Sequence, residues 1–328
     1  MAGLIGGFIL SQAIHAVAKL GVVDGFDGEA QTPKAIAAKL GLHETALYRV
    51  MRCLASVGVF AEDSNGAFTL TPMGELLRSD HPQSLRAWAV MAGEPWVRAP
   101  WSDVIDTLKT NEPAFDRVMG KSAYEYLAAN PAAAALFQAA MSQGSRMFTR
   151  AVLEAYDFST INHIVDVGCG EGGFIVEILT AYPRMRATLF DLPHVEQAAS
   201  SNLEQAGLSE RCVVVSGSFF EHVPEGGDAY LLKWVLHNLD DAPCVKILQQ
   251  CREAMSNDAR LILVERILPA GNAPSDGKIL DLNMMVLQGG RERTEAEFRA
   301  LLETAGFELV RVTETASPLS VVEGRPVT

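Results

Sequence analysis

The segment HIVDVGCGEGG, residues 163–173, places an apolar strand directly before a loop rich in glycine. Glycines at 168, 170 and 172 allow a ligand to touch the backbone, because glycine has no side chain in the way. A second apolar segment, ATLFD, ends at Asp191, 21 positions beyond Gly170. A carboxylate at that strand end can accept hydrogen bonds from both hydroxyls of a ribose. The order of strand, glycine loop and acid therefore predicts a binding site for an adenosine-type cofactor.

The spacing within the loop favours S-adenosylmethionine over a dinucleotide. The loop reads GxGxG with a further Gly173, whereas dinucleotide sites read GxGxxG. S-adenosylmethionine has no phosphate and needs no anion site at a helix N-terminus, and Glu171 in the loop would repel a pyrophosphate. The loop alone leaves two alternatives open: a tight strand-to-helix connection that binds nothing, and a nicotinamide-dependent dehydrogenase.

The composition limits the partners. The 328 residues are enough for two domains and carry a formal net charge of −13, with a pI near 5.0. This acidic balance argues against nucleic acid or an anionic membrane as a partner, because phosphate binding needs clustered Lys and Arg. The five cysteines are scattered without a CxxC pair, which indicates reduced thiols, a cytoplasmic location and no zinc site. We also expect no hard cation, since no oxygen-rich cluster is evident.

The N-terminal ten residues are apolar but fit neither a secretory signal nor a membrane span. No Lys or Arg precedes Lys19, and polar residues interrupt the run well short of roughly 20 apolar residues. We expect residues 4–10 to be covered by the second subunit of a homodimer, since they would otherwise expose an apolar patch.

Residues 32–60, TPKAIAAKLGLHETALYRVMRCLASVGVF, predict a helix, a turn and a second helix, followed by a hairpin around Asn65-Gly66. This is the outline of a winged helix. A DNA-binding regulator is one alternative, with residues 44–57 as the reading helix. The exposed cations of that helix would be only Arg49 and Arg52 in an acidic chain, which favours dimer contacts or a wall beside an active site.

After Tyr156 the pattern changes to alternating strands and helices, which predicts a Rossmann-like, doubly wound α/β domain. We therefore expect a helical, winged-helix-like domain over residues 1–155 and a cofactor-binding domain over residues 156–328. The predicted strands are 163–167, 187–191, 212–216, 229–234 and 260–265; helices are predicted at 173–182 and 193–206, and an antiparallel pair of strands within 307–327.

Three residues are candidates for the chemistry. His237 follows the buried strand 229–234, at the edge where doubly wound sheets place their ligands. Glu265 closes the strand LILVE, and Glu292 lies in the loop GGRERT. Together they form a plausible base with two orienting carboxylates. Each also has an ordinary interpretation: a histidine satisfied by backbone, and acids paired with nearby arginines.

Several motifs, taken in order, resemble the S-adenosylmethionine-dependent O-methyltransferases of the plant caffeic acid and bacterial antibiotic or pigment type. Besides the glycine loop they are FDLPHV at 190–195, GSFFEHVPEGGDAYLLKWVLHNLDD at 217–241, LILVERILP at 261–269 and GGRERTEAEF at 289–298. The likeness covers nearly the whole chain and includes the winged-helix part, which this family uses to form dimers.

The resemblance implies roles for individual residues. His237 would be the general base, flanked by Glu265 and Glu292. The implied cofactor contacts are Gly168, Gly170, Asp191, Leu192, Ser218, Phe219 and Lys233, and the implied acceptor pocket includes Phe137, Met141 and Met284. For the last three, core packing is the default when they are considered alone.

Two positions depart from the family pattern. Ser218 stands where the family usually has Asp, which predicts a lower affinity for the cofactor. Asn238-Leu239 stands where relatives commonly have Asp-Trp, which removes an acid beside the base but leaves the base itself.

The expected reaction is methyl transfer from S-adenosylmethionine to a hydroxyl of a small aromatic or polyketide-like acceptor, with S-adenosylhomocysteine as product. A phenol has a pKa of about 10 and attacks poorly while protonated, so an imidazole that removes the proton accelerates the transfer by about 10²- to 10⁴-fold. N-methylation and a non-methylating reaction on the same fold stay open as alternatives.

Overall fold

The computed structural model describes residues 1–327, apart from the side chains of residues 146 and 147. Contacts divide the chain into two compact units: residues 1–103 with 117–144, and residues 104–116 with 145 onward. The division falls inside one long helix. The predicted functional domains, 1–155 and 156–328, stay a prediction.

The part of the chain before the large sheet is mainly helical, as predicted. Its elements are α1 (Ala2–Ile5), α2 (Gly7–Lys19), η1 (Val23–Gly25), α3 (Pro33–Leu40), α4 (Glu44–Ala55), β1 (Phe60–Glu62), β2 (Phe68–Leu70), α5 (Pro72–Glu75), α6 (Arg86–Gly93), α7 (Pro95–Arg98), η2 (Ala99–Asp103), α8 (Val104–Thr110), α9 (Ala114–Met119), α10 (Ala123–Ala129) and α11 (Pro131–Ala155).

The winged-helix outline is present in the first unit. Thr32 caps α3 by accepting a hydrogen bond from the backbone of Ala35, and Gly41 ends that helix in a left-handed conformation. Helix α4 follows, with its buried residues at helical spacing. Strands β1 and β2 then pair antiparallel around the predicted turn, where Gly66 has a φ of 75°.

The second unit is built on a seven-stranded sheet with the order β5-β4-β3-β6-β7-β9-β8. The five neighbouring strands β5, β4, β3, β6 and β7 run parallel, while β9 is antiparallel to both β7 and β8. This confirms the doubly wound α/β prediction and the antiparallel pair at the C-terminus. Its elements are β3 (His163–Val167), α12 (Gly173–Ala181), β4 (Arg186–Asp191), α13 (Glu196–Gln205), β5 (Cys212–Ser216), β6 (Ala229–Lys233), η3 (Leu236–Asn238), α14 (Asp241–Ala254), β7 (Arg260–Arg266), α15 (Asp276–Leu287), α16 (Glu295–Thr304), β8 (Phe307–Glu314) and β9 (Leu319–Pro326).

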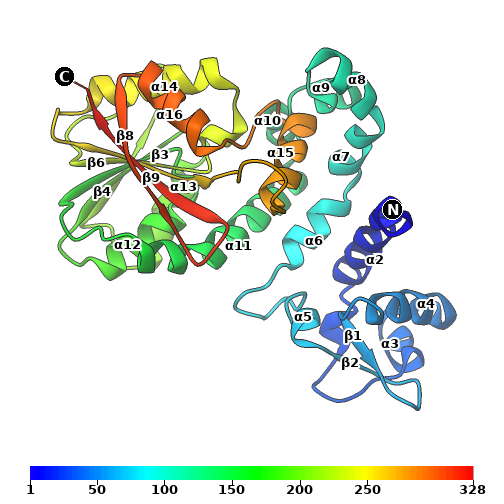
Figure 1. Cartoon of the computed structure of the whole chain (residues 1–328). Coiled ribbons are helices and arrows are strands. Elements are labelled where there is room, and N and C mark those ends of the chain that lie inside the picture. The colour runs from blue at the N-terminus through cyan, green and yellow to red at the C-terminus, as the bar shows by residue number, and fades with distance from the viewer. Residues whose placement is uncertain (328) are drawn as a thin grey trace. The chain divides into compact units, whose positions relative to one another are not determined.

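Helices cover both faces of this sheet (Figure 1). Helices α12 and α13 and the end of α11 pack on one face, and α14 and α16 pack on the other. Both faces of the central strands are therefore buried, which explains their continuous apolar sequences. The five parallel strands all end at the same edge, and this edge receives the glycine loop, Asp191 and the turn that contains His237.

The predicted strand limits agree with the structure to within one residue. One helix differs: α13 begins at Glu196 rather than at Pro193. The backbone N–H of Val195 donates to the carbonyl of Leu192, so residues 192–195 form a turn before the helix.

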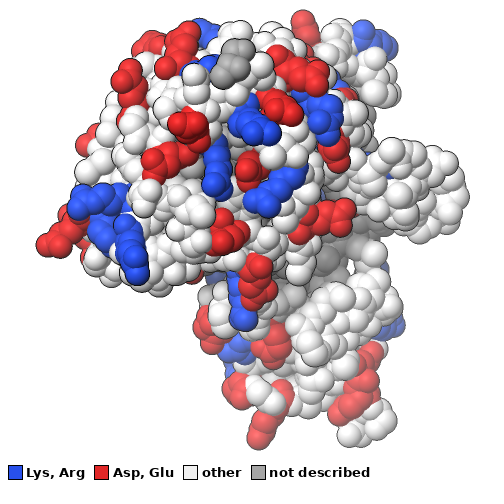
Figure 2. Space-filling model, turned by 60° about the vertical axis from the view of Figure 1, so that its left-hand side comes forward, with Lys and Arg blue, Asp and Glu red and all other residues white. Residues whose placement is uncertain are grey.

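On the face drawn in Figure 2, acidic and basic side chains are interspersed and form no broad area of one sign. Within residues 1–327, no helix is both long enough and apolar enough to cross a membrane.

Candidate active site

The candidate catalytic residue His237 lies in a short 3-10 turn, η3, just after strand β6. Trp234, three positions before His237, has a φ of 55°, a left-handed conformation that bulky side chains rarely adopt. The side chain of Asn238 donates a hydrogen bond to the carbonyl of Trp234 at 2.9 Å. An aspartate, which the family resemblance predicts at this position, has no N–H with which to make this bond when ionised. Asn238 thus supports the sharp bend that aims His237.

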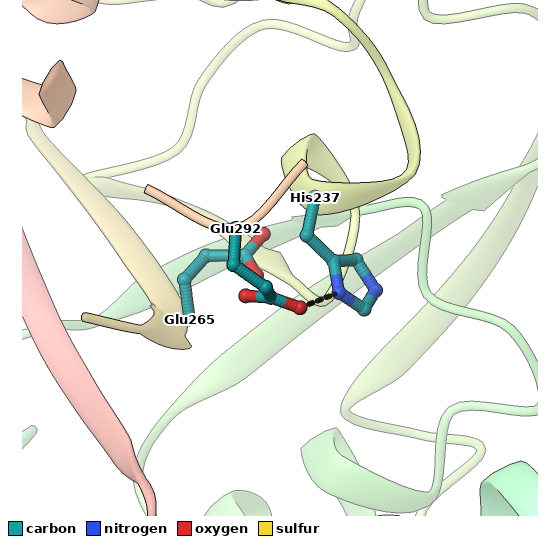
Figure 3. A group of neighbouring side chains, drawn as sticks. All are labelled: His237, Glu265 and Glu292. Atoms are coloured by element: carbon teal, nitrogen blue, oxygen red, sulfur yellow. Dashed lines mark hydrogen bonds and ion pairs between the residues drawn. The ribbon is translucent and has the colours of Figure 1, made fainter. Parts of the chain in front are cut away.

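The imidazole of His237 is held by Glu292. Its Nδ1 lies 2.8 Å from Oε1 of Glu292, and the two side chains are 12% and 1% exposed. Figure 3 shows the carboxylate of Glu292 turned toward the imidazole. A carboxylate at Nδ1 fixes the proton on that nitrogen and leaves Nε2 as the proton acceptor. Nε2 makes no hydrogen bond to any described residue.

Glu265 makes its hydrogen bonds to the backbone of the turn and none to the imidazole ring. Its Oε1 accepts hydrogen bonds from the backbone N–H groups of Val235 and Leu236 at 3.1 and 3.0 Å, and its Oε2 is buried without a partner among the described residues. The expectation that Glu265 flanks His237 therefore needs refinement: this carboxylate fixes the backbone that carries the imidazole. Burial raises the pKa of Glu265 to about 7; the imidazole opposes this rise and the carboxylate of Glu292 adds to it.

The loop of residues 289–293 holds the other side of the turn. The backbone N–H of Arg291 donates to the carbonyl of His237 at 2.9 Å. The fully buried guanidinium of Arg293 donates to the carbonyls of Leu236 and Leu239 at 3.0 and 2.9 Å and pairs with Asp241. At Gly290, a Cβ atom would lie 2.1 Å from the carbonyl oxygen of His237. The loop therefore binds the backbone carbonyls of three residues of the turn.

These charges set the protonation of the base. Burial lowers the pKa of His237, but the hydrogen bond to Glu292 and the charges of Glu265 and Glu292 outweigh it, while Arg266 acts in the lowering direction. The net pKa lies above the ordinary value of 6.5. The glutamates thus make the imidazole a stronger base than a free histidine.

The glycine loop and Asp191 form a second cluster at the same sheet edge. Oδ2 of Asp191 accepts the backbone N–H of Gly170 at 2.8 Å, and its Oδ1 accepts that of Leu192 at 2.7 Å. Gly168, Gly170 and Gly172 all have positive φ angles, of 78°, 54° and 74°. A Cβ at Gly168 would lie 2.7 Å from Val235, whereas one at Gly170 would meet no atom within 4 Å. The backbone at Gly170 therefore borders open space, as a ligand-binding loop requires.

Lys233 lies at the end of strand β6, among aromatic rings. Its Nζ donates to Oγ of Ser145 at 2.8 Å and lies 4.3 Å from the ring centre of Trp234. Burial lowers its pKa to about 8, against the raising effect of Asp166 and Glu265. Burial also raises the pKa of Asp166, in the middle of strand β3, to about 7. A buried ammonium and a buried carboxylate beside the glycine loop fit a ligand with both an acidic and an amino group, as the methionine part of S-adenosylmethionine has.

The remaining predicted cofactor residues lie near the loop. Phe219 approaches to 3.7 Å from the Cβ position at Gly168, and Leu192 is 44% exposed directly after Asp191. Ser218, where the family resemblance predicts an Asp, accepts the backbone N–H of Phe220 through Oγ at 3.3 Å.

The predicted acceptor residues belong to different units. Phe137 and Met141 lie in helix α11 within the first unit, and Met284 is buried in α15 of the second. Their part in acceptor binding stays a prediction. Within the second unit, the ring of Trp234 stacks on His237 at a centroid distance of 6.4 Å and meets Phe148 edge to face at 6.0 Å.

His237, Glu265 and Glu292 each offer one metal-ligand atom within 4.8 Å of the others. In the structure, however, Nδ1 of His237 and Glu292 bond to each other, and Oε1 of Glu265 bonds to backbone N–H groups. These hydrogen bonds occupy atoms that an ion would need. That the protein uses no metal stays a prediction.

Two residues that support the turn were not singled out from the sequence: Trp234 and Arg293. The only sequence signal for Trp234 is its position at the strand end before His237. Arg293 is one of the nearby arginines expected at most to pair with the candidate acids, and the structure pairs it with Asp241 instead.

Comparisons with known proteins identify the family of the chain. A family model described as an O-methyltransferase domain matches residues 101–308, and one described as an O-methyltransferase dimerisation domain matches residues 2–80. The phenazine O-methyltransferase PhzM of Lysobacter antibioticus is 43% identical over 99% of this chain and 95% of its own length. An 8-amino-8-demethylriboflavin N,N-dimethyltransferase of Streptomyces davaonensis is 35% identical over 95% of this chain and 90% of its own.

Solved structures also match this chain over nearly its whole length. The crystal structure of LaPhzM matches with a TM-score of 0.92 at 42% identity, covering 99% of this chain and 98% of that one. The O-methyltransferase NcsB1 from neocarzinostatin biosynthesis, solved with S-adenosylmethionine and 2-hydroxy-5-methyl naphthoic acid, matches with a TM-score of 0.82 at 33% identity, covering 97% and 96%.

Fold and site together define a methyltransferase that uses S-adenosylmethionine. The chain belongs to the O-methyltransferase family whose members carry an N-terminal dimerisation domain. The resemblance, the fold class and the cofactor predicted from the sequence are confirmed.

Proposed function

We propose that the protein transfers a methyl group from S-adenosylmethionine to a hydroxyl of a small aromatic acceptor, with His237 as general base. The observation that carries this proposal is the pair His237–Glu292. Its 2.8 Å hydrogen bond occupies Nδ1 and leaves Nε2 for an acceptor hydroxyl. The named acceptors of the relatives, a phenazine and a hydroxynaphthoic acid, are aromatic and support the acceptor class.

Two residues of the site would take part in proton transfer, and two others would position the base. Nε2 of His237 takes the hydroxyl proton as the acceptor oxygen attacks, and Glu292 stabilises the imidazolium that forms. Glu265 and Arg293 keep the turn in place, so that the base stays within reach of the acceptor. When bound, S-adenosylmethionine supplies a methyl group on a positively charged sulfur.

The glycine loop and the strand ends would hold the cofactor. Asp191 has lone pairs beyond its two backbone hydrogen bonds and is placed to accept the ribose hydroxyls. Lys233 is placed to pair with the carboxylate of the methionine part, and Phe219 to contact the adenosine. Gly168, Gly170 and Leu192 would present backbone to the ligand, and Ser218 a hydroxyl.

The direct test replaces His237 with Ala. We expect the transfer rate to a phenolic acceptor to fall by about 10²- to 10⁴-fold, while the dissociation constant of S-adenosylmethionine changes little. The rate is measured by mass spectrometry of the acceptor, and binding by calorimetry. Full activity in the variant would falsify the assignment of the base. A panel of phenols that gains no methyl group despite bound cofactor would sink the proposed reaction itself.

Methylation of an amine is the second candidate, because one relative is named as an N,N-dimethyltransferase. A neutral amine has a free lone pair and needs less help from a base than a phenol does. Paired phenol and aniline acceptors distinguish the two: under the first proposal the phenol is the faster substrate, and the His237→Ala variant loses activity mainly toward the phenol. A non-methylating reaction is disfavoured by the intact His237–Glu292 pair.

We also propose that the protein is a homodimer formed through residues 2–80. The dimerisation model covers these residues, and the side chains of Leu4, Ile5, Phe8 and Ile9 are 55–81% exposed in the single chain. Burying such a patch in a subunit contact is favourable. Light scattering during size-exclusion chromatography should give twice the chain mass, and Phe8→Asp should shift the population toward monomer. A wild-type monomer at micromolar concentration would contradict this.

A further inference from the structure

We propose that Asp281, on helix α15, is a positioning residue that places Glu292 against the catalytic histidine. The inference rests on the proposed function of His237 and extends it to a residue with no place in that mechanism. Oδ1 of Asp281 accepts the backbone N–H of Glu292 at 2.8 Å. The same Glu292 holds Nδ1 of His237 through its side chain.

Glu292 itself has only two hydrogen bonds among the described residues, although its neighbours on both sides are well held. Arg291 bonds to the His237 turn, Asp241 and Glu297, and Arg293 bonds to the same turn, to Asp241 and, through its carbonyl, to the backbone N–H of Leu268. The backbone N–H of Glu292 points away from that turn, toward α15. An N–H at this partly buried position needs an acceptor, and the carboxylate of Asp281 is the one it has. Without it, residue 292 is tied to the turn only through its own side chain.

Asp281 is itself well fixed. Helix α15 is capped by Ser275, whose side chain accepts the backbone N–H of Gly277 at 3.1 Å. In its first turn Asp276 pairs with Arg266, at the end of strand β7, at 2.6 Å. Met284, one turn beyond Asp281, is buried. The helix is therefore anchored on both sides of Asp281 and provides a firm support for the loop.

Several charges act on this network. Burial raises the pKa of Asp281; among the neighbouring side chains, Glu292 and Glu297 raise it and Arg291 lowers it. The imidazole of His237 is acted on by Glu265 and Arg266 from strand β7 and by Glu292 from the loop before α16. Glu292 is thus common to both environments, and displacing it must lower the pKa of His237. Loss of Asp281 should therefore change the rate and the pH profile together.

The test compares Asp281→Ala with Asp281→Asn. An asparagine keeps an oxygen that accepts the N–H of Glu292, whereas an alanine does not. We expect kcat in the Ala variant to fall by about 10- to 100-fold, because small displacements of catalytic groups are costly, with KM nearly unchanged. The Asn variant should stay within a few-fold of wild type. Equal losses in both variants would overturn the proposal, since the charge and not the hydrogen bond would then matter.

A double mutant gives the sharper test. If Asp281 acts only through Glu292, adding Asp281→Ala to Glu292→Ala should cost no more than about a further twofold, the usual limit of additivity errors. Independent, multiplying losses would contradict the inference. Asp228→Ala is the matched control: it removes an aspartate that accepts two backbone N–H groups at the opposite edge of the sheet. That control should leave kcat and its pH dependence unchanged.

A readout without activity separates this inference from the proposed reaction. Titration of the labelled His237 imidazole by NMR, in the protein without acceptor, should show a pKa lower in Asp281→Ala than in Asp281→Asn. Asp281→Ser, which is too short to reach Glu292, serves if the Ala variant folds poorly. An unchanged His237 titration in both variants would defeat the inference even if methyl transfer is confirmed. If the wild type methylates nothing but the titration shifts as stated, only the proposed reaction fails.

Discussion

The glycine loop and the His237 turn lie at the same edge of one sheet, yet they are fixed by different means. The loop takes its shape largely from its own backbone, with three glycines at positive φ, and is held by hydrogen bonds to the carbonyl of Phe190, the carboxylate of Asp191 and the side-chain amide of Asn202. The turn is held from outside by Glu265, Glu292 and Arg293, which come from strand β7 and from the loop before α16. The loop leaves room for a ligand, whereas the turn is locked in place to aim one ring.

This difference predicts different responses to mutation. A change in the loop should act first on cofactor affinity. A change in the supports of the turn should act first on stability and on the rate of the chemical step.

The largest effect on folding should come from Arg293→Met. This change removes the charged donor from the carbonyls of Leu236 and Leu239, at a cost of about 1–3 kcal/mol each, and leaves the thiol of Cys244 as a weak donor to both. We expect the free energy of unfolding, from urea titration, to fall by about 2–4 kcal/mol. Arg325→Met is the control, because that arginine is 61% exposed and its ion pair with Glu308 should contribute no more than about 1 kcal/mol. Equal losses in the two variants would mean that the turn is not held by Arg293.

Gly168→Ala should act on both regions at once. The new methyl group would lie 2.7 Å from Val235, beside the His237 turn. Holding an alanine at a φ of 78° costs about 1–2 kcal/mol more. We expect the dissociation constant of S-adenosylmethionine, from calorimetry, to rise by about tenfold or more, which corresponds to about 1.4 kcal/mol. Gly226→Ala has a comparable φ of 91° with open space around it and should leave cofactor affinity unchanged. Unaltered binding in the first variant would show that the loop tolerates a side chain.

The pH dependence of kcat should depend on the His237 turn and not on the glycine loop. The pKa of His237 is raised above 6.5, so the imidazole is protonated and inactive as a base at lower pH. We expect kcat to fall about tenfold per pH unit below that raised pKa. In Glu292→Gln the acid limb of the kcat profile should move to lower pH, because the carboxylate no longer raises the pKa of His237. The maximal kcat at high pH should also fall. A limb that does not move in this variant would separate Glu292 from the base.

The smallest effect is expected at Ser218. The family resemblance predicts an acid at this position, so Ser218→Asp should strengthen cofactor binding by a few-fold, about 1 kcal/mol for one further hydrogen bond. The change should leave the pH limb of kcat where it is. Weaker binding in the variant would mean that the serine suits this site better than the carboxylate.

The two regions also differ in how far the sequence predicts them. The loop was predicted in detail because its signals are local: an apolar strand, glycines at fixed spacing and an acid at the next strand end. The cap of α16 by Thr294 and Glu297 is a local signal of the same kind, since the two residues lie three positions apart. His237, Glu265 and Glu292 were singled out, but what Glu265 does was not foreseen.

The supports of the turn are remote in the chain. Arg293 bonds to a carbonyl 57 positions away, and Glu292 to a ring 55 positions away. No periodicity or spacing predicts such pairs, because they depend on where the fold brings strand β7 and the loop between α15 and α16. Trp234 shows the same limit: only the coordinates reveal that a tryptophan takes a left-handed conformation before the base.

The tight contact at Gly290 has a consequence for the history of the gene. Any side chain there would push a carbon atom into the backbone carbonyl of His237. In a library that samples every codon, we expect position 290 to tolerate nothing but glycine, while its neighbour 291 accepts many residues. Every lineage that descends from this gene is therefore expected to keep glycine at this one position.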